Sequence, residues 1–439
     1  MKEAYTKTLI VLAIVLTFTS LVIEAIELAD VANICENETL ILNLNEYAKF
    51  DGNSIASSTL RCIVRRSNYV NIEEGSFENV PNLKYLDLRR NRISKRNLFS
   101  FGDISHLKVL NLGHQDNQPN YYYNSEEAII ISNMYPELEY LDLSYISISN
   151  IRVEGDLFLE NLFPNLTHLN LSGNKISSPL SLTLPPTLKH FDLSNNGISQ
   201  FSFEKLNNLL SLRLDHNEIN ALDHRHVDLK PLQNLANLSI TNNQIKYISN
   251  SIENLLNLRY LNLSYNSLSD FDFKMIKDLY LLEVLALDGN SIDAVSTSVS
   301  SNITTLSLNN NRIISITTDS FCNLKNLRRL FLSRNKIWII HVNSFQNQTL
   351  LEELYLDDND LSHLPPYWYQ HTKKLRYLNL SGNKFTSLEP VLYDSNFPVT
   401  RLYFERNPIM YINGSVMTPE ITIFLNIKPT SRVSKIEYL

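Results

Sequence analysis

The sequence predicts an α/β-type repeat solenoid, in which a parallel β-sheet lines the concave side and a mostly irregular return forms the convex side. The first observation is a pattern, L-x-x-L-x-L-x-x-N-x-L, that recurs along almost the whole chain, as at Leu327, Leu330, Leu332, Asn335 and Ile337. The second is its spacing, which is mostly 21 to 24 residues. A fixed period of this length is typical of stacked supersecondary units that share one core.

The asparagine of the pattern can be followed through fifteen turns of the chain. Thirteen turns keep asparagine, whereas Gln115 and Ile146 depart from it. The positions are Asn68, Asn91, Gln115, Ile146, Asn174, Asn196, Asn217, Asn243, Asn266, Asn290, Asn311, Asn335, Asn359, Asn383 and Asn407.

The two halves of each repeat have different roles. In the L-x-L segment the leucines point inward and the x residues point to the other face, because side chains alternate along a strand. We expect the asparagine amide to bond backbone groups of neighbouring turns that would otherwise be buried unpaired. The return carries Ile313, Phe321 and Leu324 in one turn, with Phe77 and Phe345 at matching places, so phenylalanine is expected to fill the outer core.

The amino-terminal end predicts a signal peptide and a secreted, extracellular protein. Lys2 and Lys7 precede an apolar run from Leu9 to Ile23, which is shorter than the about 20 residues of a membrane span. Ala25 is a small residue suited to cleavage, and an uncleaved anchor is the alternative. The predicted organisation is a signal peptide over 1–25, an amino-terminal cap over 26–59, the repeats over 60–409 and a carboxy-terminal cap or tail over 410–439.

The three cysteines divide into a pair and a single residue. Cys35 and Cys62 lie near the start of the repeats, and in an oxidising compartment we expect them to form a disulfide. Cys322 is left over in a return segment, at a position expected to face the interior. A buried thiol and an intermolecular disulfide are the two interpretations.

The sequence contains no catalytic motif, and we expect no enzyme activity, no cofactor and no metal site. It has no G-x-G-x-x-G, no G-x-x-x-x-G-K-[ST], no H-E-x-x-H, no C-x-x-C and no G-x-S-x-G. The formal charge of −7 disfavours a nucleic-acid partner or an anionic membrane, which require a basic surface.

Two histidines occupy matching positions in adjacent predicted strands. His168 and His190 precede the inner residues Leu169 and Phe191, and neighbouring strands lie about 4.8 Å apart, so the rings are expected to come within contact. A surface pair without function, a pH-sensitive contact and a metal pair are the alternatives.

Nine N-x-[ST] signals are predicted to accept glycans on a secreted surface. Some of them are also what the repeat pattern spells, because Asn-Leu-Ser fits the strand. The acceptors are Asn37, Asn165, Asn170, Asn237, Asn262, Asn302, Asn347, Asn379 and Asn413.

The predicted binding surface is the concave face of the last four strands, where the x residues are rich in aromatic and arginine side chains. Phe331, Tyr355 and Tyr403 are expected to form one exposed column, with Asn379 between the last two. Stacking that merely stabilises the strands is the alternative. The set is Arg329, Phe331, Arg334, Glu353, Tyr355, Asp358, Arg376, Tyr377, Arg401, Tyr403 and Arg406.

A second candidate surface lies in the first repeats. It combines strand residues with a long insertion that is rich in turn formers and tyrosine, and long loops of this kind are often contact sites. A loosely packed variable loop is the alternative. The residues are Tyr85, Arg89, Tyr140, Tyr121, Tyr122 and Tyr123.

The asparagine-containing repeat, the phenylalanine of the return and the cysteine-bearing start together resemble extracellular leucine-rich-repeat proteins of the Toll-ectodomain, chaoptin and connectin kind. The resemblance covers about residues 35 to 410 and implies a leucine-rich-repeat horseshoe. The chain departs from these proteins because it shows neither the cysteine-rich cap that usually closes such arrays nor a following transmembrane helix.

We therefore expect a non-enzymatic secreted protein that recognises an extracellular protein ligand or receptor, in adhesion or immune-type recognition. The alternative is a membrane-tethered receptor or adhesion ectodomain, held by a partner or by an uncleaved anchor. A homodimer is compatible with either.

Overall fold

The computed structural model describes residues 39–42, 62–65, 72, 75–77, 79–115, 129–153, 159–177, 184–249, 251–392, 397–410 and 421–425. Its fold is a parallel-sheet solenoid of about 13 turns with little helix, which confirms the predicted fold class. Asn68, the first of the fifteen sequence turns, lies outside the described residues. So does most of 1–59 and of 410–439, and the predicted domain limits stay predictions.

The chain divides into two compact units, and each is described by itself. The first unit comprises residues 1–219 and 224–237, and the second comprises 220–223 and 238–439.

In the first unit each strand of the main sheet pairs in parallel with the next. The strands are β1 (Thr39–Leu42), β2 (Cys62–Arg65), β3 (Tyr85–Asp87), β4 (Val109–Asn111), β6 (Tyr140–Asp142), β8 (His168–Asn170), β9 (His190–Asp192) and β11 (Ser211–Arg213). The return side carries η2 (Lys95–Asn97), α2 (Leu159–Leu162) and the two small pairs β5 (Ile129–Ile131) with β7 (Ile151–Val153) and β10 (Phe201–Ser202) with β13 (Val227–Asp228).

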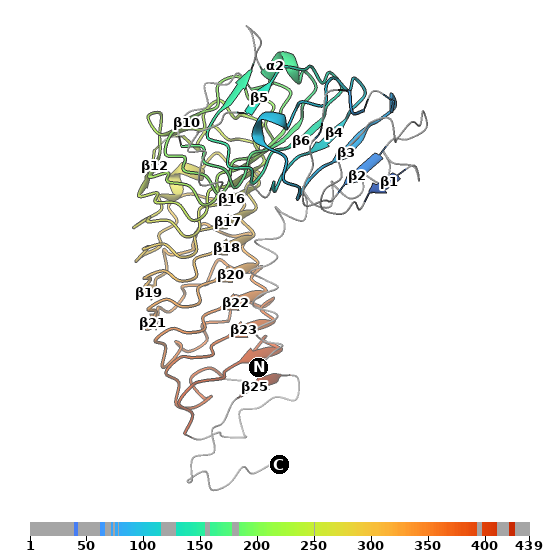
Figure 1. Cartoon of the computed structure of the whole chain (residues 1–439). Helices are drawn as coiled ribbons and strands as arrows, with labels where there is room; N and C mark the ends of the chain where they lie inside the picture. The colour runs from blue at the N-terminus through green and yellow to red at the C-terminus, as the bar shows by residue number, and fades with distance from the viewer. Residues whose placement is uncertain are drawn as a thin grey trace. The chain divides into compact units, whose positions relative to one another are not determined.

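The second unit repeats this plan, and Figure 1 shows its strands from β16 to β25 stacked one above the next. They are β16 (Tyr260–Asn262), β17 (Val284–Ala286), β18 (Thr305–Ser307), β20 (Arg329–Phe331), β22 (Glu353–Tyr355), β23 (Tyr377–Asn379), β24 (Arg401–Tyr403) and β25 (Thr422–Phe424), all parallel. The return side carries η3 (Phe273–Ile276) and the pairs β12 (Ala221–Leu222) with β15 (Tyr247–Ile248) and β19 (Ser315–Ile316) with β21 (Ile339–Ile340). The short strand β14 (Asn237–Ser239) includes the boundary between the units.

The middle residue of each strand points into the core, as the alternation of side chains predicts. Leu306, Leu330, Leu354 and Leu378 have no exposed surface and pair in register from strand to strand. The residues on either side of them point to the opposite face of the sheet. We call that surface the sheet face, and it corresponds to the predicted concave face.

The asparagine of the pattern joins each turn to the one before it. Asn290 shows the arrangement: its Nδ2 donates to the carbonyls of Leu263 and Leu287, both at 3.1 Å, and its Oδ1 accepts from the N–H of Leu268 at 3.0 Å. The carbonyls of Leu263 and Leu287 each accept a second bond, from Asn266 and Asn311 respectively, so consecutive asparagines bond the buried backbone of neighbouring turns as predicted.

The two departures from asparagine do not interrupt the sheet. Gln115 makes the same set of bonds, since its Nε2 donates to the carbonyls of Leu88 and Leu112 and its Oε1 accepts from an N–H of the preceding turn. Ile146 is fully buried, and its N–H donates to Asn174 of the next turn. The parallel pairing of β4 with β6 and of β6 with β8 is therefore continuous at this point.

Phenylalanine fills the outer core, as the return pattern predicts. Phe77, Phe321 and Phe345 are buried, and the rings of Phe321 and Phe345 stack with centroids 6.2 Å apart. Cys322 differs from the prediction: it is half-buried rather than interior, while its neighbour Phe321 takes the inward position. Cys62 is buried, whereas Cys35 lies outside the described residues, so their disulfide stays a prediction.

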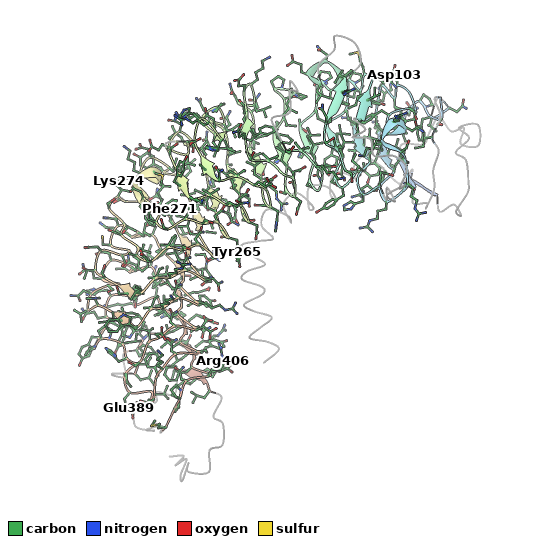
Figure 2. All side chains as sticks on the ribbon, turned by 60° about the vertical axis from the view of Figure 1, so that its left-hand side comes forward. Asp103, Tyr265, Phe271, Lys274, Glu389 and Arg406 are labelled. Carbon is green, nitrogen blue, oxygen red and sulfur yellow. The ribbon has the colours of Figure 1, made fainter. Side chains whose placement is uncertain are left out.

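From Asn91 to Asn407, the residue before each asparagine of the pattern has a left-handed backbone, which turns the chain out of the strand. We call these residues the exit column; in the second unit they include Tyr265, Gly289, Asp358, Gly382 and Arg406. Figure 2 shows Tyr265 and Arg406 on one side of this unit, whereas Lys274 and Glu389 lie on the other. The glycines serve a second purpose, because a Cβ on Gly289 would lie 2.5 Å from the Tyr265 ring and one on Gly382 2.2 Å from the Asp358 carboxylate.

Candidate binding surface

Five aromatic rings from successive strands form one stack on the sheet face of the second unit. We call Phe331, Tyr355, Tyr377, Tyr403 and Phe424 the aromatic ladder. Consecutive ring centroids lie 4.7, 4.7, 4.9 and 4.3 Å apart. These distances match the about 4.8 Å between neighbouring strands, so the sheet itself sets the stacking.

Tyr377 holds the ladder together at the strand where the register supplies no ring. Asn379 is the residue in register with Tyr355 and Tyr403. The ring of Tyr377, two residues earlier on the same strand, stacks between those of Tyr355 and Tyr403. The predicted column is therefore continuous, although Asn379 is not aromatic.

The exposure of the ladder differs from the prediction. Phe331 and Tyr355 are only 5% and 8% exposed, so the expectation that both keep apolar area in water is wrong. Tyr355 is stacked on both sides, by Phe331 and Tyr377, and Phe331 is stacked on one side by Tyr355. Tyr377 and Tyr403 are half-buried, and Phe424 is 36% exposed. The accessible part of the ladder is the end that lies on β23, β24 and β25.

The charged residues predicted around the ladder separate into groups. Arg401 is exposed and in register with Tyr377, which places it beside the accessible rings. Glu353 accepts a hydrogen bond from the Tyr355 hydroxyl at 3.0 Å, and Arg329 donates to Thr305 at 3.1 Å. Arg376 is not at the ladder, because its guanidinium donates to the backbone carbonyls of residues 373, 375 and 398.

Arg334, Asp358 and Arg406 form an ion cluster on the exit column rather than on the strands. The Asp358 carboxylate lies 2.6 Å from an Arg406 nitrogen and 3.8 Å from Arg334. Gly382 lies between Asp358 and Arg406 and leaves room for their contact. Both arginines are more than half exposed, so the cluster presents positive charge at the edge of the sheet face.

Two aspartate carboxylates of this unit accept hydrogen bonds from neighbouring turns. The Asp357 carboxylate accepts from Ser333 Oγ at 2.6 Å and from Asn379 Nδ2 at 3.1 Å. Asp288 accepts from Ser307 Oγ at 2.6 Å and from the N–H of residue 309 at 2.7 Å. Burial raises the pKa of Asp357, and it raises the pKa of Asp288 to about 6 despite these hydrogen bonds.

The second predicted surface is only partly described. Tyr85 is 6% exposed, and Arg89 lies 2.9 Å from Asp87, in an ion pair that raises its pKa further. Tyr140 packs against His168 with centroids 5.9 Å apart. Tyr121, Tyr122 and Tyr123 lie outside the described residues. The strand residues are thus packed into the sheet face, and the insertion is not placed.

His168 and His190 stack as predicted from their matching positions. Their ring centroids lie 4.3 Å apart with planes 12° from parallel. His168 Nδ1 lies 2.8 Å from the Thr167 hydroxyl, whereas the buried Nδ1 of His190 has no hydrogen-bond partner among the described residues. Burial lowers the pKa of both imidazoles, that of His168 to about 4, and the neighbouring ring and Lys189 add to the effect on His168.

The described part of the chain shows neither a metal-binding cluster nor a membrane-spanning helix. No group of three or more His, Cys, Asp or Glu side chains there is arranged to hold a metal ion. No helix there combines the length and apolar character of a membrane span.

The fold and the sheet face define a repeat protein with one large ordered surface on each unit. The leucine-rich repeat family matches residues 63–117, 233–292, 301–361 and 349–409, about half of the chain, and further leucine-rich repeats match 164–179 and 187–209. The chain belongs to the leucine-rich repeat family.

Curated relatives match parts of the chain. Mouse lumican is 28% identical over 170 residues, which is 33% of this chain and 50% of lumican. Rat osteomodulin is 32% identical over 36% of this chain and 39% of its own length. Mouse CD180 antigen is 26% identical over 59% of this chain and 40% of its own length. The chain spans about half the length of mouse and bovine lumican.

Solved structures support the fold. A leucine-rich-repeat protein of Leptospira interrogans has a TM-score of 0.64 at 23% identity and covers 90% of this chain and 98% of its own. Drosophila Toll, in its complex with Spatzle, has a TM-score of 0.62 at 17% identity and covers 85% of this chain and 54% of its own.

Sequence reasoning missed two features of the sheet face. Phe424 extends the aromatic ladder onto β25, and its position 21 residues after Tyr403, one repeat length, was the available signal. Tyr145 and Tyr265 are 46% and 42% exposed on the exit column, each with its ring over the glycine of the next turn. The pairing of a tyrosine with a glycine one turn later was the signal for them.

Proposed function

We propose that this chain is a non-enzymatic extracellular binding protein that recognises a protein partner through the accessible end of the aromatic ladder. The observation that carries the proposal is the continuous stack of five rings, of which Tyr377, Tyr403 and Phe424 keep accessible surface. Because the stacked rings are already held in place, binding of a partner costs little side-chain entropy, which favours association.

The surroundings of the ladder support a protein partner. An apolar centre with a charged rim is how protein interfaces are built, and Tyr and Arg are the residues that most often dominate their energetics. Arg401 supplies an exposed charge next to Tyr377, and the ion cluster of Arg334, Asp358 and Arg406 borders the same strands. Toll, which has a similar fold, is in complex with the protein Spatzle.

The absence of enzyme activity and of a nucleic-acid partner is part of the proposal. The sequence lacks the catalytic and phosphate-binding motifs named above, and its formal charge of −7 opposes binding to a polyanion. Secretion is likewise proposed, from the charged-then-apolar amino terminus. Recovery from cell-free medium would support a secreted protein, and recovery only in the membrane pellet would favour the tethered alternative.

The experiment that tests the site is capture of partners from extracellular fluid by the full chain, followed by binding measurements with three variants. Tyr403→Ala interrupts the accessible stack between Tyr377 and Phe424, and Arg401→Glu reverses an exposed charge that makes no ion pair with the described residues. Trp338→Ala is the matched control, because Trp338 is 53% exposed in the same unit but lies outside the sheet face.

We expect Tyr403→Ala to weaken binding by about 30-fold, which corresponds to about 2 kcal/mol at an interface anchor. Arg401→Glu should weaken it with no change in thermal stability, and Trp338→Ala should leave the affinity unchanged. Equal affinity for all three variants would contradict the assignment of the site.

A further inference from the structure

The glycosylation signals occupy two different settings in the fold. Seven of the nine lie among the described residues, whereas Asn37 and Asn413 do not. Those on the strands of the sheet face are Asn170, Asn237, Asn262 and Asn379, and those on the segments between strands are Asn165, Asn302 and Asn347. Four of the seven differ sharply in what surrounds the side-chain amide, and they carry the inference.

Asn262 has no room for a sugar. Its side chain is only 3% exposed, its Nδ2 donates to the Tyr260 hydroxyl at 3.0 Å and its Oδ1 accepts from the N–H of Ser264 at 3.0 Å. A glycan on this nitrogen would have to lie inside the packed sheet face. Molecules that received one during synthesis could not complete the strand packing.

Asn379 is half-buried beside the aromatic ladder. The ring of Tyr377 lies between those of Tyr355 and Tyr403, at the place that the register assigns to residue 379. The Asn379 amide is directed to Asp357 instead, and its Nδ2 donates to the Asp357 carboxylate at 3.1 Å. One amide hydrogen would remain for this bond, so a sugar here would instead have to displace the Tyr377 ring from its place between Tyr355 and Tyr403.

Asn165 and Asn302 occupy the same position in their repeats, four residues before the middle leucine of the strand, and both are exposed. Each Nδ2 donates to a carbonyl of the preceding turn, of Pro136 and Tyr280 respectively, at 2.8 Å. An amide nitrogen that carries a glycan keeps one hydrogen. The bond to the preceding turn can therefore persist while the sugar replaces the solvent-facing hydrogen.

We propose that Asn165 and Asn302 carry N-linked glycans in the mature protein and that Asn262 and Asn379 do not, so that no sugar covers the aromatic ladder. The inference rests on the proposed secretory route. It assigns the modification to the edge of each unit and leaves the binding surface of the second unit open.

The test is expression of the full chain with its own amino terminus in cultured eukaryotic cells. The folded product is treated with a glycosidase that converts each glycosylated Asn to Asp, and the peptides are mapped by mass spectrometry. The variants are Asn165→Gln, Asn302→Gln, Asn262→Gln and Asn379→Gln. Asn208→Gln is the matched control, because Asn208 makes the same bond to the preceding turn, at 2.9 Å, without a glycosylation signal.

We expect conversion to Asp at Asn165 and Asn302 and none at Asn262 or Asn379. Asn165→Gln and Asn302→Gln should each increase electrophoretic mobility by one glycan, and Asn208→Gln should not. Thr167→Ala and Thr304→Ala, which destroy the signals but keep the asparagines, should give the same mobility as the corresponding Gln variants.

Two results would overturn the inference, and they can be told apart. A glycan at Asn262 or Asn379 in folded product, or unmodified Asn165 and Asn302 beside other occupied signals, contradicts the geometry while the secretory route stands. The absence of glycan from all nine signals contradicts the secretory route and the inference together.

Discussion

Acidification should destabilise the first unit through the stacked histidines His168 and His190. The pKa of His168 is about 4 in the folded chain against 6.5 for an ordinary histidine, because burial and the neighbouring ring oppose its charge. Between pH 4 and pH 6.5, His168 therefore binds a proton in the unfolded chain but not in the folded chain. Stability that is present above about pH 6.5 is therefore lost as the pH falls toward 4.

The size of the effect follows from the shift. A difference of 2.5 between 6.5 and about 4 corresponds to about 3 kcal/mol at 1.36 kcal/mol for each pKa unit. Because the rings are partly exposed, solvent screening reduces this free energy, and about 3 kcal/mol is its upper limit. His190 should add to the loss, since its buried Nδ1 would become a donor with no acceptor among the described residues.

The assay is urea unfolding followed by circular dichroism at pH 7.5 and pH 4.5, for the natural chain and for His168→Gln. Glutamine cannot titrate, so the difference in unfolding free energy between the two pH values should be smaller in the variant by up to about 3 kcal/mol. His224→Gln is the control, because His224 is exposed in the same unit. Equal pH dependence in the natural chain and His168→Gln would refute the reasoning, as would an NMR titration in which His168 protonates near pH 6.5.

Three further predictions concern stability. Asn290→Ala leaves the buried N–H of Leu268 without its acceptor and removes one of two donors from the carbonyls of Leu263 and Leu287, so it should cost about 1 to 3 kcal/mol, read from urea unfolding; a loss below about 0.5 kcal/mol would contradict the amide's role. Gly382→Ala should cost at least about 1 kcal/mol of stability, because φ at this residue is +67° and the added Cβ would collide with Asp358. Gly197→Ala is the control and should change the melting temperature little, because an added Cβ there would lie no closer than 3.6 Å to any other residue. Asp288→Asn should stabilise the chain at pH 7.5 by up to about 3 kcal/mol and have less effect at pH 4. The pKa of Asp288 is about 6 in the folded chain against 3.8 ordinarily, so the natural chain loses stability as the pH rises from 3.8 to 6. Equal effects of the substitution at both pH values would contradict this role of Asp288.

The repeat could be predicted from the sequence because its signal lies in spacing and residue type. The leucines, the asparagine and the return phenylalanine each have one physical role in every turn, and all three roles are met in the structure. The spacing also locates the exceptions. It does not show that Gln115 reproduces the asparagine bonds or that Asn174 serves the N–H of Ile146, because those outcomes depend on side-chain reach across turns.

The exposure of the candidate surface could not be predicted in the same way. Alternation places Phe331 and Tyr355 on the sheet face, and from there the sequence predicts solvent exposure. Rings of the adjacent strands stack on both faces of Tyr355 and on one face of Phe331, and this depends on rotamers and on neighbours one turn away. Arg376 illustrates the same point, since a residue counted with the ladder uses its guanidinium for backbone carbonyls.

The continuity of the ladder depends on a residue outside the column that the register defines. Rings on alternate strands would lie about 9.6 Å apart, twice the strand spacing, and leave a gap as wide as one ring. Tyr377 fills that gap over Asn379, so the apolar surface is unbroken from Phe331 to Phe424. Ser307, which is in register with Phe331, ends the ladder on the other side because no ring of β18 compensates in the same way. The accessible end of the stack is therefore supported by rings that are themselves buried, and a partner bound to Tyr403 and Phe424 would rest on a surface already fixed by the sheet.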